Sequence, residues 1–142
     1  MKLTLNICDD REEIVIYAKE KSPLICEIEK LIKNYSIDII GYDNGAVIKL
    51  PLSQIYCFSV EENKIFVYTQ KEKLQIKQRL YEIEKIIDNN FVKINQSCIV
   101  NVNEIERFDA SFAGSMMVTL KNGYKDYVSR RQLRIVKERI GF

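Results

Sequence analysis

The stretch FVKINQSCIVNVNEIERFD, residues 91–109, decides how this chain is interpreted. Its two ends are rich in β-branched and aromatic residues, and Asn95-Gln96-Ser97 between them is polar. Such runs on either side of a short polar loop predict paired strands. Amides in a loop usually bond to the backbone, but Asn and Gln can also form two hydrogen bonds to adenine, and Lys93 or Ser97 can bond to phosphate or base. The stretch therefore predicts a β structure that presents a polar loop.

The final stretch, VSRRQLRIVKERIGF, predicts a C-terminal helix with a basic start. Ser129 is a typical N-cap residue, and Gln132 three positions later predicts a capping box. Arg130 and Arg131 then fall in the first turn, where the helix macrodipole disfavours cations. Two arginines in that turn are explained if they bind an anion such as phosphate together with the helix N–H groups. An ordinary capped helix that pairs its arginines with carboxylates is the alternative.

Charge is uneven along a chain whose formal net charge is only +2. Residues 1–34 carry six basic and seven acidic side chains, whereas residues 121–142 carry seven basic and two acidic ones. Helical periodicity turns Leu133 and Val136 inward and leaves Arg134 on the outer surface. A basic end on a nearly neutral chain indicates a face that meets an anion, although a solvated helix face gives the same pattern.

Several classes of function are disfavoured by composition. The chain contains no histidine, so the usual general base and every histidine-containing triad are missing, and no catalytic residues are expected. The four cysteines are widely spaced without a C-x-x-C pair, so neither a metal site nor another cofactor is predicted. A small hydrolase or ligand-binding domain is disfavoured because no glycine-rich phosphate loop is present. No apolar run could span a membrane and no secretory signal is seen, so a cytoplasmic protein is expected.

The N-terminal part predicts a small β-β-α arrangement. Lys2–Ile7 alternates between apolar and polar residues, and Ile14–Ala18 is rich in β-branched residues. Between them, Asp9–Glu13 is interpreted as the charged turn of a hairpin. Ser22-Pro23 then predicts a helix start, and apolar residues at helical spacing continue to Tyr35.

From residue 41 the pattern is mainly β. Asp43-Asn44-Gly45 predicts a turn, Glu61–Lys64 predicts the polar tip of a hairpin, and Asn122-Gly123 predicts a tight hairpin near the C-terminus. Ile76, Leu80, Ile83 and Ile87 are spaced for an amphipathic helix over Gln75–Asp88. The predicted fold class is α+β, mainly antiparallel β, with two amphipathic helices plus the N-terminal β-β-α extension.

Residues 91–101 and 128–142 together resemble the LytTR family of bacterial DNA-binding domains. The family pattern is an aromatic-led strand, a polar loop ending in Ser, a β-branched pair and Asn, which here runs from Phe91 to Asn101. The family then ends with a hairpin, here Leu120–Tyr124, and with the Ser-Arg that starts the last helix, Ser129-Arg130. Leu50–Phe58 is similar to the family's first strands. The resemblance covers about residues 40–141.

The resemblance implies a transcriptional regulator that contacts the major groove of double-stranded DNA through loops and the start of the C-terminal helix. Arg130 is the best candidate for reading guanine and Gln96 for a base edge or phosphate, while Asn101 is expected to cap a turn. Many family members carry His and a basic residue where this chain has Asn95-Gln96, which leaves the target sequence open. The full set of expected DNA-binding residues is Arg130, Gln96, Asn95, Ser97, Lys93, Ser129, Arg131, Arg134, Asn63 and Lys64.

Many members carry the domain after a receiver, and the pair Asp9-Asp10 superficially resembles a receiver's magnesium pocket. A receiver needs on the order of 120 residues, whereas about 40 precede the β part here. We therefore expect a stand-alone regulator, with residues 1–38 as a possible dimerisation element and residues 39–142 as the LytTR-type domain. A homodimer would bind repeated half-sites. The alternative is a protein-interaction module, such as an anti-activator, that kept the fold but lost DNA affinity.

Overall fold

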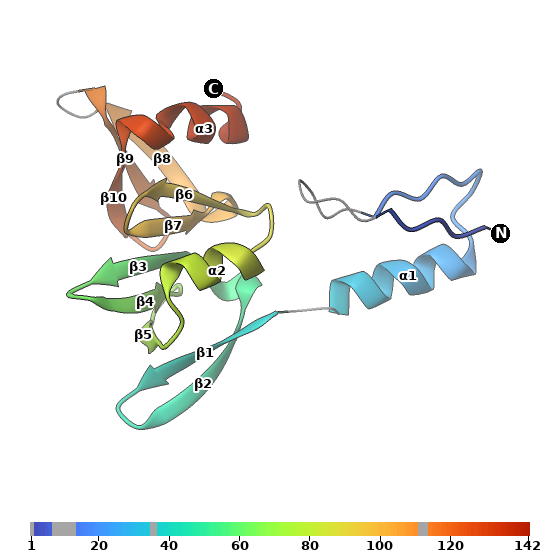
Figure 1. Cartoon of the computed structure of the whole chain (residues 1–142), viewed down its shortest axis with the longest axis horizontal. Helices are drawn as coiled ribbons and strands as arrows, with labels where there is room; N and C mark the ends of the chain where they lie inside the picture. Colours follow the sequence, from blue (N-terminus) through green and yellow to red (C-terminus); the bar gives the residue numbers. More distant parts are fainter. Residues whose placement is uncertain (1, 7–13, 35–36, 111–113) are drawn as a thin grey trace. The chain divides into compact units, whose positions relative to one another are not determined.

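The structure, a computed structural model, describes residues 2–6, 14–34, 37–110 and 114–142. It divides into two compact units, Met1–Tyr35 and Ser36–Phe142. The expected hairpin turn at residues 9–13 lies outside the described residues. Each unit is considered by itself below (Figure 1).

The N-terminal unit contains helix α1 (Pro23–Asn34). The helix begins as the sequence predicts, because the Ser22 hydroxyl accepts a hydrogen bond from the Ile25 N–H at 3.4 Å. The two predicted strands are wrong in the described residues, since residues 2–6 and 14–18 form no strand. Alternation requires a buried face to stabilise a strand, but Leu3 is 93% exposed and Leu5 is 81% exposed.

The C-terminal unit is built from two antiparallel sheets (Figure 1). The larger has seven strands in the order β2-β1-β5-β4-β3-β7-β6, and the smaller has three in the order β10-β9-β8. The architecture is α+β and mainly antiparallel, as predicted. The strands are β1 (Asp38–Asp43), β2 (Ala46–Pro51), β3 (Cys57–Glu61), β4 (Lys64–Tyr68), β5 (Lys73–Ile76), β6 (Phe91–Asn95), β7 (Cys98–Asn101), β8 (Ile105–Ala110), β9 (Met116–Leu120) and β10 (Lys125–Val128).

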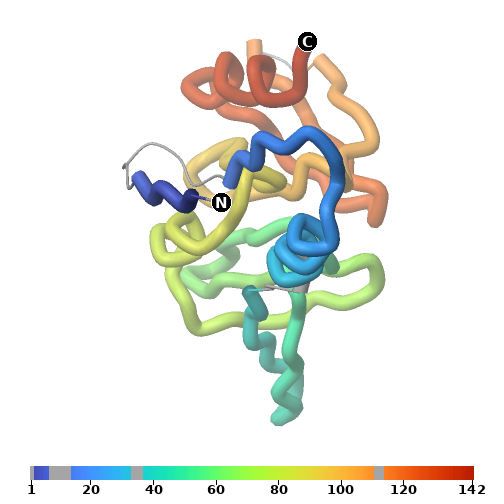
Figure 2. The backbone as a smooth tube through the Cα atoms, turned by 90° about the vertical axis from the view of Figure 1, so that its right-hand side faces the viewer, coloured from blue at the N-terminus to red at the C-terminus, as the bar shows by residue number. Residues whose placement is uncertain are grey.

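The helices of this unit are short or terminal. Two 3-10 turns, η1 (Leu52–Gln54) and η2 (Val102–Glu104), follow β2 and β7. Helix α2 (Leu80–Ile86) follows β5, and helix α3 (Arg130–Ile140) closes the chain. Figures 1 and 2 show the β1–β2 hairpin at one end of the unit and α3 at the opposite end.

The predicted helix over Gln75–Asp88 is too long at its N-terminal end. Leu74 and Ile76 are buried strand residues, and Ile76 pairs with Ile65 of β4. Helical spacing from Ile76 to Leu80 therefore reflects two elements that share one core. Strand pairing outweighs the local helical pattern at this point.

Two clusters of buried side chains form the core. One lies among β1–β5, α2, β6 and β7 and includes Ile39, Phe58 and Ile83. The other joins the β6–β7 region to the smaller sheet and α3, and includes Val100, Val118 and Val136. Val136 holds α3 against this second cluster, which fixes the place where the helix begins.

Candidate nucleic-acid interface

Three segments that the sequence singles out meet at one edge of the C-terminal unit. The Val60 N–H donates to the Ser97 carbonyl at 2.8 Å, which places the β3–β4 tip beside the β6–β7 loop. The Ser129 N–H donates to the Ile94 carbonyl at 2.9 Å, which places the start of α3 beside the same loop. All three lie toward the left of Figure 1. The fold therefore gathers residues 62–64, 96–97 and 129–131.

The β3–β4 tip is a tight two-residue turn. Glu61 pairs with Lys64, and Glu62 and Asn63 both have positive φ, 50° and 64°. This backbone matches the strand twist of a two-residue hairpin, and Asn tolerates it well. Asn63 and Lys64 are exposed at the turn. The tip thus presents an amide and a cation at the edge.

Asn95 does not lie on this surface, contrary to the expectation that it contacts DNA. It is 2% exposed, and its amide donates to the Asp126 carboxylate at 3.1 Å and to the Tyr127 carbonyl at 2.8 Å. Its side-chain oxygen accepts from the Ser97 N–H at 2.8 Å. Asn95 is therefore a positioning residue that shapes the loop, whereas Gln96 and Ser97 are exposed.

A partly buried polar network supports the β6–β7 loop. The Tyr124 hydroxyl lies 3.0 Å from the Ser59 hydroxyl and 3.0 Å from the Asp126 carboxylate, which also holds Asn95. Burial raises the pKa of Tyr124 well above its usual range, with the neighbouring Cys98 adding to the effect. Tyr124 thus stays protonated and hydrogen-bonded. The sequence gives no signal for this network because its members are far apart along the chain.

The start of α3 is capped, but the capping box is incomplete. The Ser129 hydroxyl accepts from the Gln132 N–H at 3.3 Å, as predicted. The reciprocal bond to the Ser129 N–H is replaced by the Ile94 carbonyl. The second bond therefore ties the helix to the loop strand instead of to Gln132, which makes the position of Arg130 depend on β6.

The remaining residues of the predicted DNA-binding set differ in how exposed they are. Arg130, Arg131 and Arg134 are exposed on α3, and Gly114 lies near Arg130, whose Nε would be 3.7 Å from a Cβ added there. Lys93 is only half-exposed, and its ammonium pairs with Glu84 of α2 at 3.0 Å. Lys93 is thus held by α2 rather than presented with the loop. Asn101 is structural as expected, since its side chain caps η2 by accepting from the Asn103 N–H at 3.0 Å.

Other kinds of site find no support in the described parts of the chain. Within them, no group of three or more Cys, Asp or Glu residues could hold a metal ion. None of the helices in the described ranges is long and apolar enough to cross a membrane. Cys57 and Cys98 are fully buried, and burial raises the pKa of the Cys57 thiol far above its usual range. A buried thiol of this kind is unreactive.

The C-terminal unit is an antiparallel β domain that presents loops and a basic helix start at one edge. This arrangement is typical of a class of nucleic-acid-binding domains. Residues 45–141 match the model of the LytTr DNA-binding domain family. The chain belongs to this family, and its β domain is a DNA-binding domain rather than an enzyme.

Relatives and solved structures agree with this membership. The chain is 28% identical over 142 residues to proteins of Staphylococcus aureus strains NCTC 8325 and N315 that are named HTH-type transcriptional regulators, covering 99% of this chain and 97% of theirs. A solved LytTr DNA-binding domain of a Bacillus cereus protein has the same fold, with a TM-score of 0.69 and 22% identity over 74% of this chain and 97% of that one. In the described residues of this chain, α2 and α3 are separated by five strands, so they form no helix-turn-helix pair.

Proposed function

We propose that this protein is a sequence-specific transcriptional regulator that reads the major groove of double-stranded DNA with three segments. These are the β3–β4 tip, the β6–β7 loop and the first turn of α3. The observation that carries the proposal is their meeting at one edge, through the bonds from Val60 to Ser97 and from Ser129 to Ile94. The major groove, about 12 Å wide, admits a helix or a two-stranded β-ribbon such as the tip of a hairpin.

The residues divide into three roles. Arg130 is proposed to donate two hydrogen bonds to a guanine, which is the commonest specific contact to a base in the major groove. Gln96 and Ser97, exposed on the loop, are proposed to contact a base edge and a phosphate. Arg131, Arg134, Lys64 and Asn63 are proposed to contact the backbone, which sets register and affinity without carrying sequence information. Asn95 and Lys93 are outside these roles, because Asn95 shapes the loop from inside the fold and Lys93 is paired with Glu84.

We further propose that the N-terminal unit joins two copies of the protein. None of its described residues is buried, and its exposed apolar side chains include Leu3, Leu5, Ile14, Val15, Ile16, Tyr17, Leu24, Leu31 and Ile32. A unit of this size rarely stabilises itself without another surface to cover it. A second copy would cover these side chains and give the pair two identical DNA-binding edges for repeated half-sites.

The test is selection of bound duplexes from a random pool, repeated with Gln96→Ala and Arg130→Ala. The wild-type protein is expected to enrich one motif. Arg130→Ala is expected to lose discrimination at one base pair, at a cost of about 1–3 kcal/mol. A pool without an enriched motif would contradict the proposal and would favour a protein-interaction module, such as an anti-activator with this fold.

A further inference from the structure

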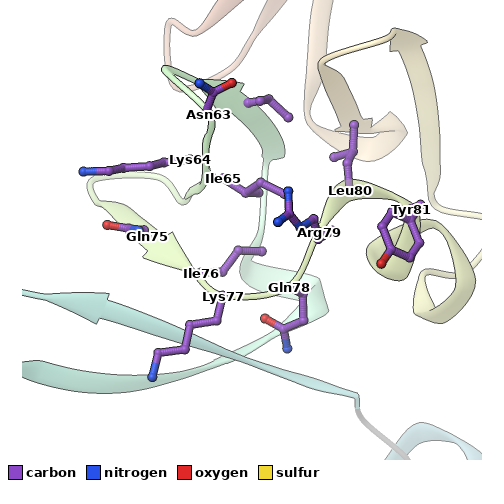
Figure 3. Close-up of a pocket in the computed structure, with 11 residues that line it drawn as sticks. Asn63, Lys64, Ile65, Gln75, Ile76, Lys77, Gln78, Arg79, Leu80 and Tyr81 are labelled. Carbon is purple, nitrogen blue, oxygen red and sulfur yellow. The ribbon is translucent and has the colours of Figure 1, made fainter.

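A basic groove continues the proposed DNA edge on its side away from α3. It has a volume of about 560 Å³ and lies where β4, β5 and the start of α2 meet (Figure 3). Apolar side chains, among them Ile65, Ile76 and Leu80, line its inner part. Besides Tyr81, its polar lining comprises three cations and three amides with no carboxylate: Lys64, Lys77, Arg79, Asn63, Gln75 and Gln78.

The cations of this groove have no acidic partner in the described residues. None of Lys64, Lys77 and Arg79 forms a salt bridge there, although other lysines do, such as Lys73 with Glu61 at 2.6 Å and Lys93 with Glu84 at 3.0 Å. In Figure 3, Arg79 lies near the centre of the labelled residues. The ammonium of Lys77 lies over the Tyr42 ring, 4.6 Å from its centroid, and Lys77 also lines a neighbouring hollow with Glu82, with which it forms no salt bridge. Three cations without a salt-bridge partner favour the binding of an anion in this groove.

The strand order places this basic groove about one DNA major-groove width from the β6–β7 loop. β7 carries the loop at residues 96–97, and β3, β4 and β5 follow it in the sheet. Three strand spacings amount to about 14 Å, slightly more than the width of the major groove, about 12 Å. If the loop lies in the major groove, the end of β5 lies over the phosphate backbone that borders it.

We propose that Lys77 and Arg79, with Gln78 between them, bind the phosphate backbone of the same DNA duplex beyond the bases that the loops read. This inference rests on the proposed function and extends the proposed DNA-contacting surface to the end of β5. An open groove without a glycine-rich loop suits a polymer backbone better than a small anion, which binds best in an enclosed site.

The test compares Lys77→Gln/Arg79→Gln with the wild-type protein on the selected duplex at several salt concentrations. Loss of two phosphate contacts should make the slope of log K against log salt shallower by about 1.8. Affinity should fall about tenfold at 0.15 M salt, equally for matched and mismatched sequences, and the selected motif should not change. Ethylation of the flanking phosphates should weaken the wild-type protein and leave the double variant unaffected.

Lys71→Gln/Lys121→Gln is the matched control. Both lysines are exposed at the other end of strands β4 and β5 from the groove, where the Asn122 amide of the β9–β10 turn donates to the Thr69 carbonyl. This double substitution removes the same two positive charges. The slope of log K against log salt should stay within about 0.3 of the wild-type value, because no phosphate contact is lost.

Three results would overturn the inference alone, and a fourth would overturn it together with the proposed function. An unchanged slope in Lys77→Gln/Arg79→Gln, with specific binding intact, rejects the groove and leaves the proposed function standing. Equal slope changes in both double variants reject it in favour of net charge alone. Saturable binding of inorganic pyrophosphate that is lost in Lys77→Gln/Arg79→Gln assigns the groove to a small anion. If the wild-type protein enriches no duplex, both the proposed function and this extension fail.

Discussion

Asn95 and Gln96 are adjacent in sequence but have opposite roles. The β6–β7 pairing shifts register between Lys93 and Asn95, so Ile94 and Asn95 are both buried instead of alternating. The Asn95 side chain forms its hydrogen bonds within the fold, whereas Gln96 is exposed. Simple alternation could not reveal this, because a shift in register is decided by a partner strand as well as by the strand's own sequence.

Substitution of the two neighbours should therefore separate stability from binding. Asn95→Ala leaves the Ser97 N–H and the Tyr127 carbonyl without their partner, and is expected to lower the free energy of unfolding by about 2–3 kcal/mol. Gln96→Ala is expected to change it by less than about 0.5 kcal/mol, as for an exposed side chain, while altering base preference. Urea denaturation measures the first effect and selection of bound DNA measures the second. Equal stability of the two variants would contradict the buried role of Asn95.

At the scale of elements, the start of α3 depends on two bonds at Ser129. The hydroxyl caps the helix, and the backbone N–H anchors it to the Ile94 carbonyl. The serine, the basic first turn and the end at Gly141, where φ is 93°, could all be predicted from local patterns. The anchor to β6 could not, because it depends on where the strand ends in space.

Ser129→Ala should lower the free energy of unfolding by about 1 kcal/mol, the usual cost of a lost N-cap. Gln132→Ala should cost less than about 0.5 kcal/mol, because its side chain does not complete the capping box. Thermal unfolding of both variants checks this difference. A cost for Gln132→Ala as large as that for Ser129→Ala would show that the box is closed in solution.

The elements also show where local patterns stop being informative. The hairpin turns at Asn44-Gly45 and Asn122-Gly123 were predictable because the positive φ at Asn44, Gly45 and Gly123 falls on residues that tolerate it. Lys73–Ile76 was not, since its membership of a strand depends on β4. For the candidate site, Arg130 and Gln96 were predictable by type and position. Lys77 and Arg79 carried no comparable signal, because only the strand order places them along the same edge.

At the scale of the whole molecule, the half-buried Tyr124 predicts loss of stability in alkali. Burial raises the pKa of Tyr124 from an ordinary value of 10.0. A group whose pKa is raised in the folded state contributes stability that is fully present below its unfolded pKa and is lost as the pH rises beyond it. The free energy of unfolding should therefore fall above about pH 10.

Tyr124→Phe removes this contribution and should make the fall shallower by at most about 1.4 kcal/mol per pH unit. The exposed Tyr81→Phe serves as the control and should retain the wild-type slope. Urea denaturation at pH 7, 9 and 10.5 gives the comparison. Identical slopes for wild-type protein and Tyr124→Phe would contradict the buried network.

The two units predict separable behaviour. Without residues 1–35, the C-terminal unit should still unfold cooperatively, because both core clusters lie within it.

The full chain is expected to sediment as a dimer at micromolar concentration and the shortened chain as a monomer. Leu31→Glu, at a side chain 72% exposed on α1, should also give a monomer, whereas Lys30→Glu on the same helix should remain dimeric. A monomeric full chain would contradict dimerisation and leave the DNA-binding edge unaffected.

The central claim, that the gathered loops read a DNA sequence, is tested most directly by the ratio of two affinities. Fluorescence anisotropy would be measured with the selected duplex and with a scrambled duplex of equal length and composition, at 0.15 M salt. The selected duplex is expected to bind at least about 10³-fold more tightly, and Arg130→Ala is expected to remove about 10- to 100-fold of this ratio. Equal affinity of the wild-type protein for the two duplexes would contradict the central claim.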